Sequence, residues 1–403
     1  MSSEPFVEPI SQIPSGWHKI TLIELVTFHR GYDLPLKEKN DGKYPIVGSN
    51  GIIGYHDSFK AKGPGVTIGR SGNLGKSFFV NEDYWPHNTT LYSSEFHRSD
   101  PSFVYYFLKT LSLSKYNAGS AVPTLNRNHI HTIEIIVPKD MAEQKDIAKV
   151  LSSLDSKIEL NQQMNKTLEA IGQAIFKRWF VDFEFPNEEG KPYKSSNGKM
   201  IDSILGVIPE GWQIGKLSQI ADLLMGISPE GTSYNDAGVG MPLLNGAADF
   251  KESVIIPGKW TKTPIKICKK GSLLFCIRAT IGNLVFADRE YCLGRGVAAL
   301  NPKNALFTEF VYYVLHQSLR KLASEASGSV ILGLSKNDVE ELSVTIPDNQ
   351  TLAKFHEICL VLLGKIANQS QNTLTLATIR DCLLPRLMSG KIRVPVPKEN
   401  VEA

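Results

Sequence analysis

A glycine-rich stretch at 66–80, "VTIGRSGNLGKSFFV", contains the residue types that bind phosphate groups. A phosphate-binding loop has Gly, four residues and then Gly-Lys-Ser/Thr, a spacing that lets backbone amides surround phosphates at the start of a helix. Here five residues separate Gly69 from Gly75, and the "FFV" that follows Gly-Lys-Ser is typical of a strand. We therefore predict a turn before a strand. A nucleotide-binding enzyme that uses the Gly69–Ser77 loop is the alternative.

Histidine, cysteine and carboxylate residues supply most metal ligands and many nucleophiles, but here they form none of the familiar catalytic motifs. The sequence has no G-x-S-x-G, no H-E-x-x-H and no C-x-x-C, and its five cysteines all lie in the second half. Reduced, packed thiols are expected. We predict no catalytic residue, no metal and no cofactor for this chain.

The composition is that of a soluble globular protein. With 403 residues the chain is long enough for two or three domains. Its longest apolar runs, such as "LLFCI" and "ICLVLL", are much shorter than the roughly 20 residues that cross a bilayer. The N-terminus lacks the basic start and apolar core of a secretory signal, so we expect a cytoplasmic protein. A net charge of +3 neither requires nor excludes a nucleic-acid partner.

Several blocks of the sequence occur twice and in the same order, which is the signature of an internal repeat. The matching blocks are "IPSGW" at 13–17 with "IPEGW" at 208–212, "FVYYFLKTL" at 103–111 with "FVYYVLHQSL" at 310–319, Gly72–Leu74 with Gly282–Leu284, and 119–138 with 328–347. A duplicated enzyme would carry its catalytic residues twice, or once in a clearly diverged copy. His129 and His131 correspond instead to Asp338 and Glu340, which argues against a shared catalytic role.

Each copy divides into a globular part and a long helix. The predicted parts are a first globular domain at 13–140, a helix at 141–182, a polar connector at 183–207, a second globular domain at 208–348 and a helix at 349–393. The globular parts are rich in glycine and β-branched residues, with short alternating runs that end at proline. They are therefore predicted to be β-rich.

The two long helices carry apolar residues on a heptad ladder of the same phase. The predicted seam residues are Leu151, Leu154, Ile158, Leu168 and Ile175 in the first helix, and Cys359, Leu362, Ile366, Leu376 and Leu383 in the second. This pattern predicts two coiled-coil helices. If they pair antiparallel, the polar interruptions at Asn161 and Asn165 should meet those at Gln369 and Thr373. The alternative is that each helix lies on its own domain. Gly172 and Arg380 are further irregularities that the sequence leaves unexplained.

Two globular domains, two similar long helices and the segments "IPxGW", "GKPYKSSNGKM" and "RLMSGKIRV" resemble the specificity subunit of type I restriction–modification systems. The resemblance covers essentially the whole chain. It implies an α+β fold with two tandem β-rich target-recognition domains, each followed by a long helix. The helices would pair as an antiparallel coiled coil, giving an internal pseudo-twofold repeat.

The resemblance also implies a function and partners. Each recognition domain would read one half of an asymmetric, bipartite double-stranded DNA target, and the coiled coil would set the spacer. The helices would dock two DNA adenine methyltransferase subunits, which bring S-adenosylmethionine, and two ATP-dependent restriction subunits could join them. The chain itself would be non-catalytic. A coiled-coil scaffold that does not bind DNA is a further alternative.

Basic and amide side chains in the turns are the candidates for DNA contacts, since they position phosphates and read base edges. The candidates are Arg70, Ser71, Asn73, Lys76, His87 and Asn88 in the first domain, and Arg278, Thr280, Asn283 and Arg295 in the second. Arg70 and Arg278 are taken as counterparts. The alternative is that the Gly-Asn pairs only make tight turns and the arginines are solvated. "NRNH" at 126–129 and "SKND" at 335–338 are predicted to be turns and helix caps.

Overall fold

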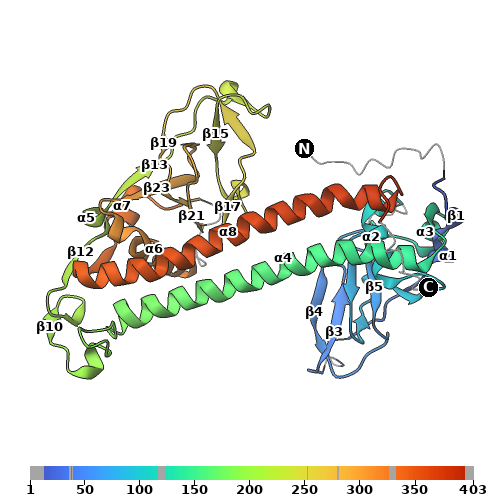
Figure 1. The fold of residues 1–403 in the computed structure, drawn as a ribbon, viewed down its shortest axis with the longest axis horizontal. Coiled ribbons are helices and arrows are strands. Elements are labelled where there is room, and N and C mark those ends of the chain that lie inside the picture. The colour runs from blue at the N-terminus through green and yellow to red at the C-terminus, as the bar shows by residue number, and fades with distance from the viewer. Residues whose placement is uncertain are drawn as a thin grey trace, which may run out of the picture. The chain divides into compact units, whose positions relative to one another are not determined.

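The computed structural model describes residues 13–35, 38, 40–116, 123–251, 253–278, 281–325 and 333–394. The chain divides into two compact units: Met1–Ile158 with Thr375–Ala403, and Glu159–Leu374. Each unit holds one globular domain together with part of each long helix (Figure 1).

The first unit contains a four-stranded sheet, a three-stranded sheet and a separate strand pair. The sheets have the order β2-β8-β5-β6 and β4-β3-β7, and β1 pairs with β9. The strands are β1 (Trp17–Thr21), β2 (Thr27–Arg30), β3 (Tyr44–Gly48), β4 (Gly51–His56), β5 (Gly65–Gly69), β6 (Ser77–Val80), β7 (Trp85–Pro86), β8 (Thr90–Glu95) and β9 (Glu134–Pro138). Among these strands β3 and β7 pair in parallel, and an isolated bridge between Tyr32 and His87 is parallel as well.

Helix α2 (Pro101–Thr110) covers the four-stranded sheet of the first unit. Its Phe103 and Phe107 share one buried cluster with Phe28 and Ile68 from the strands. Asp100 caps the helix, because the Phe103 amide donates to its carboxylate at 2.9 Å. The short helices are α1 (Leu22–Leu25), α3 (Arg127–His131) and a 3₁₀ turn at Leu113–Tyr116.

The second unit repeats the four-stranded sheet and the separate strand pair, and its other sheet has five strands instead of three. Its sheets have the order β13-β23-β20-β21 and β14-β18-β15-β22-β19, and β12 pairs with β24. The strands are β12 (Gln213–Lys216), β13 (Ala221–Met225), β14 (Tyr234–Asn235), β15 (Met241–Leu244), β18 (Lys259–Thr261), β19 (Ile267–Cys268), β20 (Leu273–Cys276), β21 (Gly282–Phe286), β22 (Tyr291–Leu293), β23 (Val297–Pro302) and β24 (Ser343–Ile346). The parallel pair is again in the second sheet, between β15 and β22.

The helices of the second unit also follow the first. They are α5 (Leu217–Ile220), α6 (Thr308–Glu325) and α7 (Lys336–Glu340), with two additional hairpins, β10 (Met200–Ser203) with β11 (Gly206–Pro209) and β16 (Phe250–Lys251) with β17 (Val254–Ile255). Asn126 and Ser335 cap α3 and α7 through their side chains, as predicted. The repeat predicted from the sequence is therefore confirmed.

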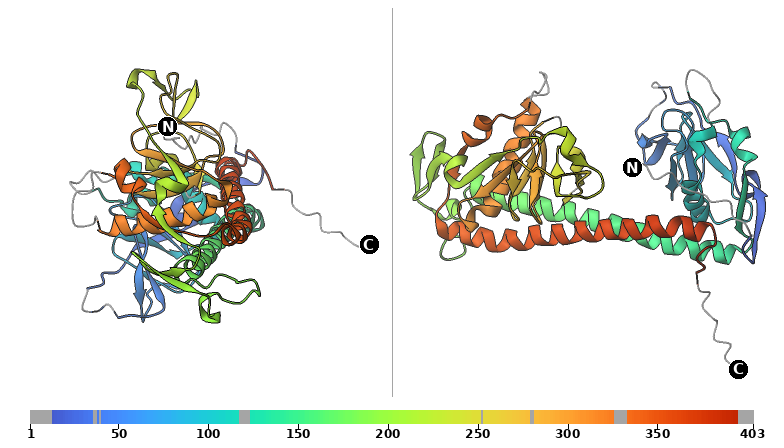
Figure 2. Two further views of the ribbon diagram at one scale, coloured as in Figure 1. Left: turned by 90° about the vertical axis from the view of Figure 1, so that its left-hand side faces the viewer. Right: turned by 90° about the horizontal axis from the view of Figure 1, so that it is seen from above.

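The long helices are α4 (Met141–Phe176), which continues as a π-helical turn over Lys177–Val181, and α8 (Asn349–Met388). Figure 2 shows them side by side, and hydrogen bonds join them within each unit. Asp155 accepts from Arg380 at 2.6 Å in the first unit, and Asn165 donates to Ser370 at 2.9 Å in the second. Later residues of α4 therefore bond earlier residues of α8, so the helices are antiparallel, as the family resemblance implied.

One polar interruption of the first ladder, Asn165, bonds α8 at the residue after Gln369. Asn165 donates to the Ser370 hydroxyl rather than to the expected Gln369, and its amide also lies 3.4 Å from the Ile366 carbonyl oxygen. Of the ten seam candidates, the structure buries Leu151, Cys359 and Ile366 fully and the other seven partly.

The domain helices account for the two irregular positions. A Cβ on Gly172 would overlap the hydroxyl of Tyr313, so glycine makes room for this ring. Arg380 bonds Asp155, whose other oxygen accepts from the Tyr106 hydroxyl at 2.7 Å. Both irregularities therefore mark places where a tyrosine of a globular domain meets the long helices.

No helix in the described part of the chain combines the length and the apolar character needed to cross a membrane.

Candidate nucleic-acid interface

Four loops of the first unit meet where the strands of its two sheets end. They follow β2, join β3 to β4, join β5 to β6 and join β7 to β8. The Tyr32 amide donates to the Pro86 carbonyl at 2.8 Å, the Arg70 amide to Thr89 at 2.8 Å, and the Ser49 amide to the Thr89 hydroxyl at 3.3 Å. The β7–β8 loop thus lies at the centre and is bonded to the three others. We call this surface the loop end.

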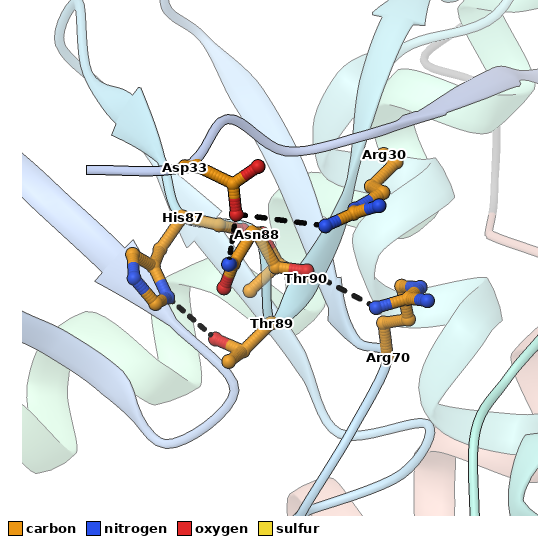
Figure 3. Close-up of polar contacts among 7 residues, drawn as sticks. All are labelled: Arg30, Asp33, Arg70, His87, Asn88, Thr89 and Thr90. Carbon is orange, nitrogen blue, oxygen red and sulfur yellow. Dashed lines mark hydrogen bonds and ion pairs between the residues drawn. The ribbon is translucent and has the colours of Figure 1, made fainter. Parts of the chain in front are cut away.

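A carboxylate organises the middle of the first loop end (Figure 3). Asp33 accepts a hydrogen bond from the side-chain amide of Asn88 and lies 3.5 Å from the guanidinium of Arg30. Arg70 reaches the Asn88 carbonyl oxygen at 3.4 Å. Arg30 and the Asn88 amide therefore contact the acid, while Arg70 bonds the Asn88 main chain, an arrangement that presents both donors and acceptors.

His87 belongs to the same loop. Its Nδ1 lies 3.0 Å from the Thr89 hydroxyl. Burial lowers the pKa of His87 below its ordinary value, although the nearby Asp33 opposes this effect. At neutral pH the ring is therefore uncharged and suited to hydrogen bonding rather than to phosphate attraction.

The remaining candidates of the first domain lie around the β5–β6 hairpin. The Ser71 amide donates to Thr89 at 3.2 Å, and the Asn73 side chain donates to Asn50 in the β3–β4 turn at 2.8 Å. Lys76 lies over the Phe78 ring at 5.1 Å. A strand follows this turn, as predicted, which removes the helix N-terminus that a nucleotide-binding loop would need.

Sequence reasoning missed an aromatic group beside these loops. Tyr32 is 39% exposed, its hydroxyl lies 3.0 Å from that of Tyr92, and Lys60 lies over the Trp85 ring at 5.1 Å. The signal was an aromatic residue directly after the basic strand end "FHRGY".

The second unit builds the same loop end with the same main-chain bonds. Ile227 donates to Leu293 at 2.9 Å, as Tyr32 does to Pro86. A Cβ on Gly226 would overlap the Gly294 carbonyl oxygen, and one on Gly31 would overlap that of His87. Gly294-Arg295-Gly296 therefore occupy the place of His87-Asn88-Thr89.

This equivalence corrects two sequence matches. Ile277 donates to Gly296 at 3.0 Å and accepts from Leu334 at 2.9 Å, as Arg70 does with Thr89 and Leu125, so Ile277 is the counterpart of Arg70. Arg278 corresponds to Ser71. The Gly-Asn-Leu match is also wrong, because Gly72–Leu74 lie in a turn and Gly282–Leu284 lie within β21. The loop between β20 and β21 is shorter, which shifted the sequence match.

The second-domain candidates are spread more widely. Arg295 donates its amide to the Ser228 hydroxyl at 3.1 Å, and the side chains of Arg295 and Arg278 are exposed. Asn283, at φ +53°, lines a cavity of about 530 Å³ together with Lys166 of α4. Thr280 lies outside the described residues.

The described residues place no three His, Cys, Asp or Glu side chains where they could hold a metal ion. Burial raises the pKa of Cys268 and Cys276 to about 11, so these thiols are protonated near neutral pH.

A duplicated α+β domain with polar loops at its end, joined by an antiparallel helix pair, defines a two-domain recognition protein. The family described as "Type I restriction modification DNA specificity domain" matches residues 14–170 and 209–375. The chain belongs to this family. It is therefore a DNA-recognition subunit with two tandem target-recognition domains.

Relatives agree over most of the chain. The putative type I restriction enzyme MjaX specificity subunit of Methanocaldococcus jannaschii is 28% identical over 394 residues, 94% of this chain and 88% of that protein. The type I restriction enzyme HindI specificity subunit of Haemophilus influenzae is 23% identical over 360 residues, 72% of this chain and 77% of that protein. The crystal structure of an S subunit from M. genitalium has a TM-score of 0.65 at 18% identity, covering 94% of this chain and 98% of that chain, so the fold is shared.

Proposed function

We propose that this chain reads an asymmetric, bipartite DNA sequence, with one half-site for each globular domain, 13–140 and 208–348. One observation carries the proposal: the loop end is built twice on the same main-chain hydrogen bonds but with different side chains. His87-Asn88-Thr89 stand in the first copy where Gly294-Arg295-Gly296 stand in the second. Equivalent surfaces with different chemistry read different sequences, so the two half-sites differ.

The loop-end side chains divide by the contacts that they favour. Arg30, Lys60 and Lys76 suit phosphate oxygens, which fix the position of a protein on the duplex without reading sequence. Asn88 and Arg295 suit base edges, where amide and guanidinium groups distinguish base pairs in the major groove. Arg70, Ser71, Asn73, His87, Arg278, Thr280 and Asn283 complete the proposed DNA surface.

The antiparallel helices set the distance between the half-sites in this proposal. At a rise of about 1.5 Å per residue, α4 and α8 extend about 54 and 60 Å. A stiff connection between two DNA-reading domains increases affinity only for targets of matching spacing. The Asn165–Ser370 bond supports one helix register, since a polar pair in an apolar seam disfavours slipped pairings.

Partner subunits supply the chemistry in this proposal. The relatives are named specificity subunits of type I restriction enzymes. We propose that two DNA adenine methyltransferase subunits dock on the helices of this chain and that ATP-dependent restriction subunits join them. S-adenosylmethionine and ATP would then bind to the partners.

Mapping N6-methyladenine in the host genome, with and without this gene, tests the proposal. We expect one bipartite motif to lose its methylation when the gene is deleted and to regain it on complementation. Unchanged methylation at every motif would contradict the function. Micromolar ATP binding by the chain that Lys76→Ala abolishes would instead support the nucleotide-binding alternative.

A further inference from the structure

One residue occupies an equivalent position in the two loop ends. It lies in the loop between β7 and β8 in the first unit and in the loop between β22 and β23 in the second. The His87 amide donates to Val47 at 2.9 Å, and the Gly294 amide donates to Leu244 at 2.8 Å. The same turn follows in both copies: the Thr90 amide donates to the His87 carbonyl at 2.9 Å, and the Val297 amide donates to the Gly294 carbonyl at 3.1 Å. Between these bonds stand Asn88 in the first copy and Arg295 in the second.

Asn88 has a fixed orientation. A carboxylate only accepts hydrogen bonds, so the side-chain nitrogen of Asn88 must face Asp33. This assignment does not depend on distinguishing nitrogen from oxygen in the amide. Asn88 keeps one N–H donor and its Oδ1 acceptor for a partner, and Arg30 at 3.5 Å holds Asp33 in turn.

One donor beside one acceptor matches the major-groove edge of adenine. Adenine presents the N7 acceptor and the N6 amino donor, and an asparagine amide bonds both. Guanine presents two acceptors, N7 and O6, so Oδ1 of Asn88 would face O6 without a hydrogen between them. The geometry at Asn88 therefore favours adenine.

Arg295 presents donors only. Its amide is tied to Ser228, at the position that Asp33 holds in the first copy, so no carboxylate faces it there. Gly294 and Gly296 let the loop pack on Asn245, because a Cβ on either would overlap Asn245 atoms. Within the described residues the guanidinium of Arg295 has no hydrogen-bond or ion-pair partner. An unpaired fork of donors on a fixed backbone matches N7 and O6 of guanine.

We propose that this loop residue chooses the purine that each domain reads: Asn88 selects adenine in one half-site and Arg295 selects guanine in the other. The inference rests on the proposed function and adds the base identity. The adenine read by Asn88 differs from the methylated one, because a methyltransferase takes its target base out of the stack.

The test is a binding selection with the full chain assembled with the host's methyltransferase subunits. The library is double-stranded DNA with two randomised blocks joined by spacers of several lengths. Wild type should select an adenine in one block and a guanine in the other, each dependent on its loop residue. We expect Arg295→Lys, which keeps the charge but loses the planar fork, to reduce the preference for one guanine roughly ten- to hundredfold and to leave the other block unchanged. Asn88→Ala should do the same for one adenine in the opposite block.

Matched controls come from the opposite ends of the same strands. Asn81, just after β6, and Lys270, in the turn before β20, are exposed, and Asn81→Ala and Lys270→Ala should leave both blocks unchanged. If Arg295→Lys or Asn88→Ala leaves base preferences intact, or weakens binding equally for all sequences, the base assignment fails while the proposed function stands. If wild type selects no bipartite sequence at all, the proposed function fails as well.

Discussion

Two equivalent tyrosines attach the recognition domains to the long helices by different chemistry. Tyr106 on α2 donates to Asp155, which also accepts from Arg380, so the first copy uses a polar network. Tyr313 on α6 packs on Gly172 and stacks on the Phe176 ring at 5.7 Å, so the second copy uses aromatic contacts. The contacts between the domains and the long helices therefore differ between the two copies, although the order of the strands in the four-stranded sheets is the same.

Burial has the same consequence for both hydroxyls. It raises the pKa of Tyr106 and Tyr313 well above the ordinary tyrosine range, and the Asp155 bond adds to the effect on Tyr106. Both remain protonated at all physiological pH values. The copies therefore differ in what the hydroxyl meets and not in its charge.

The largest expected effect is the loss of the ring at the centre of the aromatic contact. Phe355 lies 4.8 Å from Phe180 and 5.8 Å from both Trp179 and Tyr313, measured between ring centroids. We expect Phe355→Ala to lower the free energy of unfolding by about 3–5 kcal/mol. Its counterpart Ile147 is equally buried but aliphatic, and Ile147→Ala should cost less, about 2–3 kcal/mol.

Urea unfolding followed by tryptophan fluorescence measures both variants. If Phe355→Ala lowers the free energy of unfolding no more than Ile147→Ala does, the ring contacts stabilise the chain little beyond the burial of apolar surface. The two copies would then differ in side-chain shape but not in energy at this position.

The next effect tests the polar network of the first copy. Asp155→Leu leaves Tyr106 without its acceptor and Arg380 with Asp381 as its remaining acceptor, and should cost about 1–3 kcal/mol. We expect this loss of stability to be smaller than the loss from breaking a fully buried ion pair, because the side chains of Arg380 and Asp155 are 23% and 27% exposed. The triple variant Tyr106→Phe/Asp155→Leu/Arg380→Ala removes the whole network, and we expect it to recover to within about 1 kcal/mol of wild type. A triple variant no better than Asp155→Leu would show that the network contributes more than its desolvation costs.

The sequence predicted the parts of the fold that depend on local pattern. The common heptad phase predicted two coiled-coil helices, the family resemblance implied that they pair antiparallel, and the paired "IPxGW" and "FVYY" blocks predicted the repeat. The contact of Gly172 with Tyr313, and the link from Arg380 through Asp155 to Tyr106, were not predictable, because both tyrosines are distant in sequence and come from another layer. In the loop ends the residue types were visible, but the counterpart of Arg70 was misassigned, since only main-chain hydrogen bonds show how loops of unequal length correspond.

A smaller effect is expected at Gly172, where the Tyr313 side chain approaches α4 closely. We expect Gly172→Ala to lower the free energy of unfolding by about 1–2 kcal/mol, because overlap with the tyrosine exceeds the gain in helix propensity. Tyr313→Phe removes the overlapping hydroxyl but keeps the ring carbon Cζ, which would lie 2.7 Å from the added Cβ, so it should reverse only part of this loss. The control is Gly364→Ala in α8, where a Cβ would meet nothing within 4 Å, and which should stabilise by up to about 1 kcal/mol. If Gly172→Ala is as harmless as Gly364→Ala, the close approach of Tyr313 is not what requires glycine.

The smallest effect concerns how each copy holds its "IPxGW" tryptophan. Trp17 donates to Glu143 at 3.1 Å, and that carboxylate also pairs with Arg393 at 2.7 Å. Trp212 donates to Asp348 at 2.9 Å, and Asp348 accepts the Thr351 amide at 2.8 Å at the start of α8. Burial alone would raise the pKa of Asp348, but the hydrogen bonds from Thr351 and Trp212 outweigh it and lower the pKa below its ordinary value.

This lowered pKa makes the second copy sensitive to acid. Asp348 loses its proton more readily in the folded chain than in the unfolded one, so its contribution is complete above its ordinary pKa of 3.8 and is lost as pH falls below that value. Asp348→Asn keeps a side chain that caps helices about equally well but does not titrate. We therefore expect Asp348→Asn to make the decline of unfolding free energy between about pH 4 and about pH 2 less steep, because the contribution of Asp348 is lost below its ordinary pKa. Urea unfolding across that range measures the slope, and an unchanged slope would assign the acid sensitivity to carboxylates elsewhere in the chain.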